Sequence, residues 1–277
     1  MSTRIFLDSG DPAETRRVLA ADITLDGQTT NPSLIAKSPI IAERKKRGAL
    51  FGKEELLDFY RTIVKEISAL LPDGSVSVEV YADRNTAAED MLTQARECNA
   101  WIPNAHIKLP VTEQGLIAAQ LALSENLRVN LTLAFTQEQA AAVYAATSGA
   151  KKGDVFLSPF IGRLDDIGLN GIDLIRAIHA LYATGDGHVE VLAASIRSKR
   201  HYRESINLGA DIITAPAKIL LALDNAPPAD VDTAPLKPIP HATLNLKEDW
   251  RTFDITHELT DKGLDRFVAD WNALLSS

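Results

Sequence analysis

The sequence predicts an α/β fold, a single-domain (β/α)8 TIM barrel with an additional C-terminal helix. Eight short β-rich runs recur along the chain, separated by segments with helical periodicity. Strands that alternate with helices are typical of a parallel sheet, and eight such units favour a closed barrel over an open sheet. The length of 277 residues, with 45% hydrophobic residues, suits one barrel domain with a sizeable core.

The eight predicted strands are four to seven residues long, which is the usual length of a strand. In chain order they are Ile5–Asp8, Leu25–Thr30, Ser75–Val80, Ala105–Leu109, Arg128–Leu133, Val155–Phe160, Val189–Ser195 and Asp211–Ala215. No Gly-x-Gly-x-x-Gly motif follows the first strand, which argues against a dinucleotide-binding fold.

Helical periodicity is clearest in two intervening segments, where apolar residues recur every three or four positions. The first contains Leu56, Phe59, Tyr60, Ile63, Val64 and Ile67, and the second contains Leu116, Ala119 and Leu123. Thr112 and Thr136 stand before predicted helices, and threonine is a favoured N-cap residue. We therefore expect both threonines to cap helices.

The chain is expected to divide into a barrel (residues 1–222), a linker or insertion (223–259) and a C-terminal helix (260–277). Asn225–Pro240 is rich in Pro, Ala and Asp, as linkers and long surface loops are. Within Asp261–Leu275, the residues Leu264, Phe267 and Trp271 form an apolar stripe at helical spacing. That stripe has to be buried, either on its own barrel or on a neighbouring subunit.

Composition narrows the class of partners and the compartment. The net charge of −8 and the pI of about 5.3 argue against nucleic-acid binding. No apolar run reaches the roughly 20 residues that span a bilayer, and no secretory signal pattern opens the chain. Cys98 is the one cysteine, so an internal disulfide is excluded and a reducing compartment fits. We expect a cytoplasmic protein without nucleic-acid or membrane partners.

Polar residues stand late in the predicted strands, at the end of the barrel where active sites lie. Alternate residues of a strand point inward, and a core built only for stability would carry Val, Ile or Leu there. The polar candidates are Asp8, Thr29, Asn31, Glu79, Lys108, Asn130, Thr132, Ser158, Ser195 and Arg197.

Lys108 is the most informative of these residues because it ends an apolar strand, Ala105–Leu109. Burial favours the neutral form of a lysine amine, and a neutral amine is the form that attacks a ketone carbonyl. The alternative is a structural ion pair between Lys108 and Glu79. Position alone leaves both interpretations open.

Several motifs resemble those of the transaldolase family, in the family's order and over residues 4–220. They are Phe6-Leu7-Asp8, Thr29-Thr30-Asn31-Pro32-Ser33, the segment from His106 to Gly115 around Lys108, Asn130-Leu131-Thr132-Leu133, Ser158-Pro159-Phe160-Ile161-Gly162-Arg163 and Ala194-Ser195-Ile196-Arg197. Each block alone is a weak signal, whereas the ordered set is specific.

The resemblance implies a class I, metal-independent mechanism without a cofactor. Lys108 would form a Schiff base with the ketose, and Asp8 would take the proton of the C4 hydroxyl as the C3–C4 bond breaks. Glu79 and Thr132 would position a water that carries protons. Asn31 and Asn130, with Thr29 nearby, would bind the dihydroxyacetone unit.

The same resemblance implies sugar-phosphate substrates. Arg163 and Arg197 suit a phosphate because guanidinium groups bind its oxygens in pairs, and Ser158 and Ser195 would add hydroxyl donors. The implied donors are fructose 6-phosphate or sedoheptulose 7-phosphate, and the implied acceptors are erythrose 4-phosphate or glyceraldehyde 3-phosphate.

Two residues bear on the choice between transfer and cleavage. Fructose 6-phosphate aldolases of this group carry glutamine and tyrosine where this chain has Glu79 and Phe160. The chain therefore resembles the transaldolases, with a fructose 6-phosphate aldolase-like lyase, an enzyme for another ketose and a non-catalytic sugar-phosphate-binding barrel as alternatives. No His-Glu-x-x-His or His-x-His pattern occurs, which argues against a metal-dependent aldolase.

Two further features remain open at this point. His106 lies two residues before Lys108, so it is either a core histidine with satisfied hydrogen bonds or a group that tunes Lys108 or binds a different substrate. The C-terminal segment resembles the terminal helix of short transaldolases, which pack it on a neighbouring subunit in decamers, so a homo-oligomer is expected.

Overall fold

A computed structural model of the chain describes residues 2–223 and 235–276. Its eight strands are all parallel and close into one barrel in the order β1 to β8. The strands are β1 Arg4–Asp8, β2 Gly27–Thr29, β3 Ser75–Glu79, β4 Ala105–Pro110, β5 Val129–Ala134, β6 Val155–Pro159, β7 Val189–Ala193 and β8 Ile212–Ala215. The predicted (β/α)8 barrel is confirmed, and each predicted strand overlaps an observed one.

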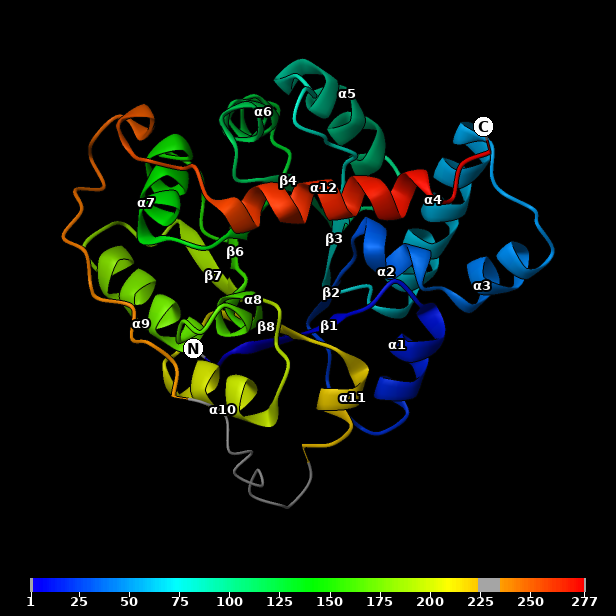
Figure 1. Cartoon of the computed structure of the whole chain (residues 1–277), viewed down its shortest axis with the longest axis horizontal. Helices are drawn as coiled ribbons and strands as arrows, with labels where there is room; N and C mark the ends of the chain where they lie inside the picture. The colour runs from blue at the N-terminus through cyan, green and yellow to red at the C-terminus, as the bar shows by residue number, and fades with distance from the viewer. Residues whose placement is uncertain (1, 224–234, 277) are drawn as a thin grey trace.

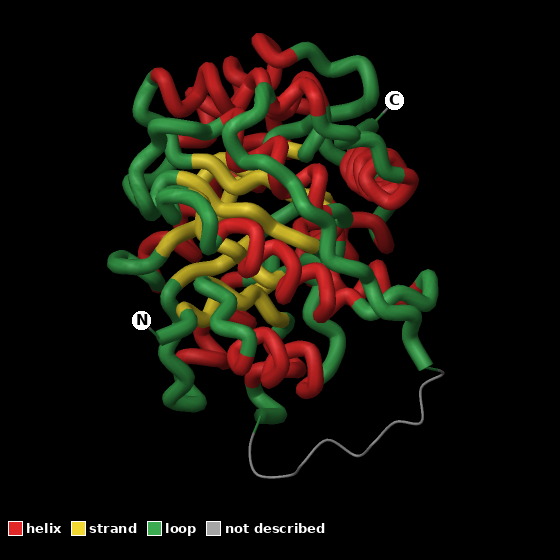
Figure 2. Tube along the Cα trace, turned by 90° about the vertical axis from the view of Figure 1, so that its left-hand side faces the viewer, coloured by secondary structure: helices red, strands yellow, loops and turns green. Residues whose placement is uncertain are grey.

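Helices surround the barrel, and the strands run through its centre (Figures 1 and 2). Their bounds are α1 Pro12–Leu19, α2 Pro32–Ala36, α3 Pro39–Lys46, α4 Lys53–Leu70, α5 Ala88–Asn99, α6 Glu113–Ser124, α7 Gln137–Ala146, α8 Ile161–Asp166, α9 Gly171–Tyr182, α10 Lys199–Asn207, α11 Ala217–Leu220 and α12 Glu258–Asn272, with a 3-10 turn at Trp250–Thr252. Thr112 and Thr136 cap α6 and α7 as predicted, since their side chains accept the backbone N–H groups of Gly115 and Gln139.

Beneath Lys108, the barrel interior contains side chains from the earlier parts of β1, β4, β6 and β7. The ring of His106 stacks on Phe156 with centroids 4.0 Å apart, and Phe6 meets Phe156 edge-on at 6.1 Å. Below them, Arg4 pairs with Glu190 at 2.7 Å. Because strands of a parallel barrel contribute side chains in layers, these residues form a floor beneath the layer that carries Lys108.

His106 is a core histidine whose two ring nitrogens are both satisfied. Nε2 lies 2.9 Å from the carbonyl oxygen of Gly153 and therefore donates, while Nδ1 accepts from the hydroxyl of Ser75 at 2.7 Å. Burial lowers the pKa of His106 to about 3, so the ring is neutral. Its partners, Ser75, Gly153 and Phe156, lie in the barrel floor, and no contact between His106 and Lys108 is found among the described residues.

The segment between β8 and α12 lies on the outer surface of the barrel where it is described (Figure 1). Lys237 exchanges backbone hydrogen bonds with Gly168 and Asn170. The side chain of Gln137 donates to the carbonyl of Pro240 and accepts the N–H of Ala242. Residues 235–240 contain no helix or strand, in keeping with the predicted loop. Residues 225–234 of that predicted loop lie outside the described residues.

Helix α12 runs across the mouth of the barrel (Figure 1). It begins at Glu258, three residues before the predicted start, because the ring of His257 accepts the N–H of Leu259 and caps it. The stripe of Leu264, Phe267 and Trp271 is buried, and α12 contacts α2 and β5 of its own chain. The apolar stripe is therefore covered within one chain, and exchange onto a neighbouring subunit stays a prediction.

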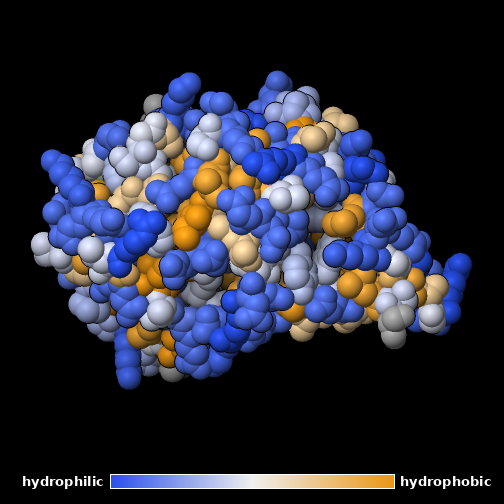
Figure 3. Space-filling view, turned by 90° about the horizontal axis from the view of Figure 1, so that it is seen from above, coloured by the Kyte–Doolittle hydropathy of each residue, from blue (hydrophilic) through white to orange (hydrophobic). Residues whose placement is uncertain are grey.

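The outer surface is mostly hydrophilic on the face that carries α5 and α6, with small apolar patches between polar side chains (Figure 3). The large apolar side chains that are exposed, Ile40, Leu50, Ile167 and Ile206, come from separate parts of the chain. In residues 2–223 and 235–276, every helix is too short or too polar to cross a bilayer.

Candidate active site

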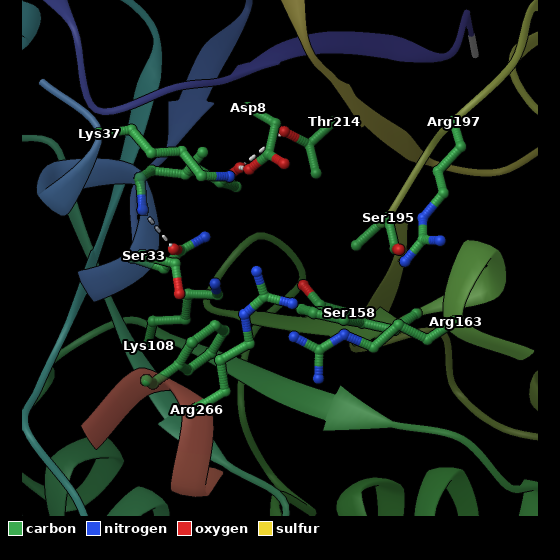
Figure 4. Close-up of a pocket in the computed structure, with 16 residues that line it drawn as sticks. Asp8, Ser33, Lys37, Lys108, Ser158, Arg163, Ser195, Arg197, Thr214 and Arg266 are labelled. Carbon is green, nitrogen blue, oxygen red and sulfur yellow. Dashed lines mark hydrogen bonds between the residues drawn. The ribbon is translucent and has the colours of Figure 1, made fainter. Parts of the chain in front are cut away.

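A cavity of about 230 Å³ opens at the barrel mouth beneath α12 (Figure 4). Nine of the twelve predicted site residues line it: Asp8, Thr29, Asn31, Lys108, Ser158, Phe160, Arg163, Ser195 and Arg197. The other three, Glu79, Asn130 and Thr132, are buried in the wall behind them. The structure therefore brings all twelve to one end of the barrel, as expected for residues at the carboxyl ends of strands.

Lys108 is 3% exposed and points into this cavity from β4. Its Nζ lies 2.9 Å from Oε2 of Glu79 and 3.5 Å from the carbonyl oxygen of Thr30. The rings of Phe160 and Phe267 are each centred 5.8 Å from Nζ, so two apolar side chains lie beside the amine. The predicted contact with Glu79 exists, and it is compatible both with a structural pair and with proton exchange between the two groups.

Burial raises the pKa of Glu79, and the nearby Lys108 opposes that rise. A raised pKa increases the fraction of Glu79 that is protonated at a given pH. If the proton moves from Lys108 to Glu79, the buried pair becomes a neutral amine beside a neutral acid. This state avoids placing two charges in an apolar site, and it supplies the amine in its nucleophilic form.

A chain of hydrogen bonds fixes the end of β3 and thereby Glu79. The backbone N–H of Glu79 donates to the hydroxyl of Tyr60 at 3.0 Å. That hydroxyl lies 2.7 Å from Oγ1 of Thr30, which in turn donates to the carbonyl of Ser77 at 2.8 Å. Since Thr30 uses its hydrogen on Ser77, Tyr60 must be the donor to Thr30. Sequence periodicity identified Tyr60 only as part of an apolar stripe and missed this role.

Asp8 lies at the end of β1, across the cavity from the arginines (Figure 4). Oδ1 accepts a hydrogen bond of 2.8 Å from Thr29, whose hydroxyl is 2.7 Å from that of Thr214. Desolvation raises the pKa of Asp8, while Lys108, the bond from Thr29 and Lys37 lower it. The carboxylate is therefore poised to take up a proton more readily than an ordinary aspartate.

The amide and hydroxyl groups around Lys108 are held in different ways. Asn31 caps α2, accepting the N–H of Leu34 at 2.9 Å with Oδ1. Asn130 donates to Ser77 at 3.0 Å and accepts from Ser158 at 2.6 Å, so it reaches the cavity through Ser158 rather than lining it. The hydroxyl of Thr132 is buried and has no hydrogen-bond partner within the described residues. A buried hydroxyl of this kind needs a partner.

A cationic side of the cavity is built where α8 meets the loop after β7. A Cβ added to Gly162 would lie 2.2 Å from the carbonyl oxygen of Ser195, so only glycine permits this close approach. Ser195 has φ of 60°, a left-handed conformation that is uncommon for a serine. Together these features place Arg163 and Arg197 on the same wall (Figure 4).

Arg163 and Arg197 differ in how their charges are compensated. Arg197 forms an ion pair with Asp166. Arg163 has no carboxylate partner among residues 2–223 and 235–276. Burial lowers the pKa of Arg163, and the nearby Arg266 and Arg197 lower it further. Converging guanidinium groups with incomplete compensation are typical of a site for a phosphate or another anion.

Sequence reasoning missed several residues of the cavity wall. They are Ser33, Leu34 and Lys37 from the region of α2, Ala194 and Thr214 from the strand ends, and Arg266 and Phe267 from α12. Thr214 stands one residue before the end of β8 and could have been found by the rule that identified the other residues late in strands. Lys37 and Arg266 carried no such signal, because they reach the cavity only through the way α2 and α12 fold over the mouth.

Within the described residues, no group of three or more His, Cys, Asp or Glu side chains is arranged to hold a metal ion. The candidate site is made of two lysines, Lys37 and Lys108, two carboxylates, amides, hydroxyls and arginines.

Comparison with known proteins shows that the chain is similar to the members of one protein family. Residues 5–277 match the family described as Transaldolase/Fructose-6-phosphate aldolase. A "Probable transaldolase" of Cereibacter sphaeroides is 38% identical over 268 residues, covering 97% of this chain and 95% of the relative. One of Dehalococcoides mccartyi is 34% identical over 271 residues (98% and 99%), and one of Brucella ovis is 37% identical over 268 residues (97% and 96%).

Proposed function

The chain belongs to the transaldolase/fructose-6-phosphate aldolase family, and we propose that it is a transaldolase acting through a Schiff base on Lys108. It would move a dihydroxyacetone unit from a ketose phosphate, such as fructose 6-phosphate or sedoheptulose 7-phosphate, to an aldose phosphate, such as erythrose 4-phosphate or glyceraldehyde 3-phosphate. The observation that carries the proposal is the buried contact of 2.9 Å between Lys108, which lines the cavity, and Glu79 in the wall behind it.

In the first step, Glu79 takes the proton of Lys108 and the neutral amine attacks the C2 carbonyl of the ketose. The resulting carbinolamine loses water and becomes an iminium. Glu79 exchanges protons through a water held at the unpartnered hydroxyl of Thr132, which is buried in the same wall. Proton transfer by a positioned carboxyl group accelerates such steps by about 10²- to 10⁴-fold.

In the second step, Asp8 removes the proton of the C4 hydroxyl. The C3–C4 bond breaks, its electron pair moves into the iminium to give an enamine, and the aldehyde leaves. The raised pKa of Asp8 suits it to hold that proton until the acceptor arrives. The enamine carbon then attacks the acceptor aldehyde, Asp8 returns the proton to the new hydroxyl, and water releases the product from Lys108.

Transfer rather than simple cleavage requires an enamine that is not protonated by the protein. Phe160 lies over Lys108 and has no hydroxyl to give a proton to the enamine carbon. Phe267 covers the amine at the same distance from another side and limits access of water. These two rings favour the transferase over the lyase alternative.

The experiment that tests the proposal is borohydride reduction in the presence of fructose 6-phosphate, followed by mass spectrometry of tryptic peptides. We expect a reduced adduct on Lys108 and no adduct in Lys108→Ala. Erythrose 4-phosphate should increase turnover of the ketose strongly. Unchanged turnover in Lys108→Ala would remove the catalytic proposal and leave a sugar-phosphate-binding barrel. Abundant free dihydroxyacetone without acceptor would favour the lyase.

Location and assembly are also proposals. A cytoplasmic homo-oligomer fits the family resemblance, but the apolar stripe of α12 is already buried on its own barrel. A self-association surface would therefore have to use other residues, or α12 would have to exchange between chains. Light scattering on the full chain and on a variant that ends before Glu258 separates these cases, because only exchange makes assembly depend on α12.

A further inference from the structure

We infer that Arg266 of α12 is a third arginine of the phosphate site and a determinant of selectivity for phosphorylated sugars. This inference rests on the proposed function, since it concerns the substrates of the same cavity. Arg266 and Phe267 are the residues of α12 that line the cavity. In the close-up, the guanidinium of Arg266 lies between Lys108 and Arg163, with Ser158 beside it (Figure 4).

The charges of the cavity support an anion at this point. The positive charge of Arg266 is the largest electrostatic influence on Arg163 and lowers the pKa of that already buried guanidinium. The carboxylate nearest to Arg266, that of Asp270, is 3.7 Å from Nε, which is longer than a hydrogen bond. Asp270 also accepts a hydrogen bond from Ser33. Arg266, which is 63% exposed, thus has one long ion pair, and Arg163 has none within the described residues. The two guanidinium groups face one space with incomplete compensation, and a dianionic phosphate would relieve their repulsion.

The close fit between α12 and Arg163 is a second, independent observation. A Cβ at Gly263 would lie 2.6 Å from Nη1 of Arg163 and 2.6 Å from Cδ2 of Leu133. Glycine within a helix costs about 1 kcal/mol relative to alanine, so its presence in the middle of α12 needs a reason. The reason in this structure is that α12 passes directly over the arginine of the phosphate site.

Arg84 holds α12 in the position from which Arg266 reaches the cavity. It donates to both carboxylate oxygens of Asp265, at 2.8 and 2.6 Å, and to Asp261 at 3.2 Å. Arg84 follows β3, the strand that carries Glu79. Because all three side chains are about half exposed, the pairs add little stability. Their two-pronged geometry instead fixes the rotation of the helix, which makes Arg84 a positioning residue.

The test measures the sugar concentration that gives half-maximal borohydride trapping on Lys108, for fructose 6-phosphate and for unphosphorylated dihydroxyacetone. In Arg266→Gln, we expect the value for fructose 6-phosphate to rise about tenfold or more, the effect of one charged hydrogen bond. The value for dihydroxyacetone should rise far less. Arg84→Gln should show the same selective effect at a smaller size, and Arg84→Lys should recover part of it.

Lys262→Gln is the matched control, because Lys262 lies on the same helix, is exposed and pairs with Glu258 away from the cavity. It should leave both values unchanged. An equal rise for both sugars in Arg266→Gln would show that α12 is merely disturbed, and no rise would show that Arg266 does not bind the phosphate. Either result overturns the inference.

A binding measurement separates this inference from the proposed function. Inorganic phosphate should raise the Tm of the full chain, since a ligand that binds the folded state stabilises it. That increase should be reduced in Arg266→Gln and kept in Lys262→Gln. If the wild type traps no sugar but shows this pattern, the Schiff-base proposal fails while the phosphate site stands. A phosphate effect of equal size in all three proteins refutes the role of Arg266.

Discussion

Tyr60→Phe removes a single hydroxyl that joins α4 to β3, the strand that carries Glu79. The change deletes the bonds of 3.0 Å from Glu79 and 2.7 Å to Thr30, and it leaves a buried backbone N–H without its partner. Each lost bond costs about 1 kcal/mol, and an unsatisfied buried donor costs about 1–3 kcal/mol. We therefore expect the free energy of unfolding to fall by about 2–3 kcal/mol, a substantial part of the 5–15 kcal/mol typical of a domain.

The same variant should lower kcat by about tenfold or more, because Glu79 loses the anchor that sets its distance to Lys108 and small displacements of catalytic groups are costly. Urea unfolding and steady-state transfer from fructose 6-phosphate to erythrose 4-phosphate are the assays. Tyr182→Phe is the matched control, since Tyr182 is also buried but donates one bond, to Ala140 at 2.8 Å, and neither residue lines the cavity. It should lose about 1 kcal/mol and keep its kcat. If Tyr60→Phe behaves no differently from Tyr182→Phe, the reasoning about the anchor is refuted.

Four further changes test other parts of the site. Lys37→Met removes a charge that lowers the pKa of Asp8, so the acid limb of kcat/KM should move to higher pH; an unmoved limb in a pH–rate profile would contradict this. Asp8→Asn should abolish transfer yet raise the Tm at neutral pH. The folded pKa of Asp8 lies above its ordinary value of 3.8, so ionisation of this carboxyl group destabilises the folded protein as the pH rises from 3.8 through the folded pKa. The gain in Tm should vanish as the pH falls toward 3.8, and a gain that is independent of pH would argue against the assignment. Phe160→Tyr places a hydroxyl over the reacting amine and should increase release of free dihydroxyacetone without acceptor, measured by a coupled assay; no increase would argue against the role of the ring. Gly263→Ala gains about 1 kcal/mol of helix propensity but displaces Arg163, so KM for fructose 6-phosphate should rise several-fold, and a raised Tm with unchanged KM would show that the arginine moves aside freely.

The barrel could be predicted because its strands are short, apolar and regularly separated, and a parallel sheet of eight such units has few alternatives. The predicted bounds of the strands differ from the observed bounds where the backbone conformation, rather than the apolar pattern, ends a strand. The run to Ser195 was predicted as strand, but β7 ends at Ala193, and Ser195 itself turns into the left-handed region. Likewise Leu25 lies outside β2, which begins at Gly27.

The site was predictable where chemistry follows strand position and not where it depends on packing across the chain. Asp8 ends β1 and Lys108 stands late in β4, so their meeting at the mouth follows from topology. Arg266 reaches the mouth only because α12 folds back over β5, more than 120 residues earlier in the chain. Tyr60 illustrates a different limit, since apolar periodicity records the burial of its ring but says nothing about where its hydroxyl bonds.

The stacked floor of His106, Phe156 and Phe6, sealed beneath by Arg4 and Glu190, makes the cavity a dead end rather than a passage. Under the proposed transfer, we expect the departing aldehyde and the arriving one to use the opening under α12 in turn. The first product must leave before the second substrate can enter. Under this proposal, the time needed for one aldehyde to leave and the other to enter determines how long the enamine has to persist.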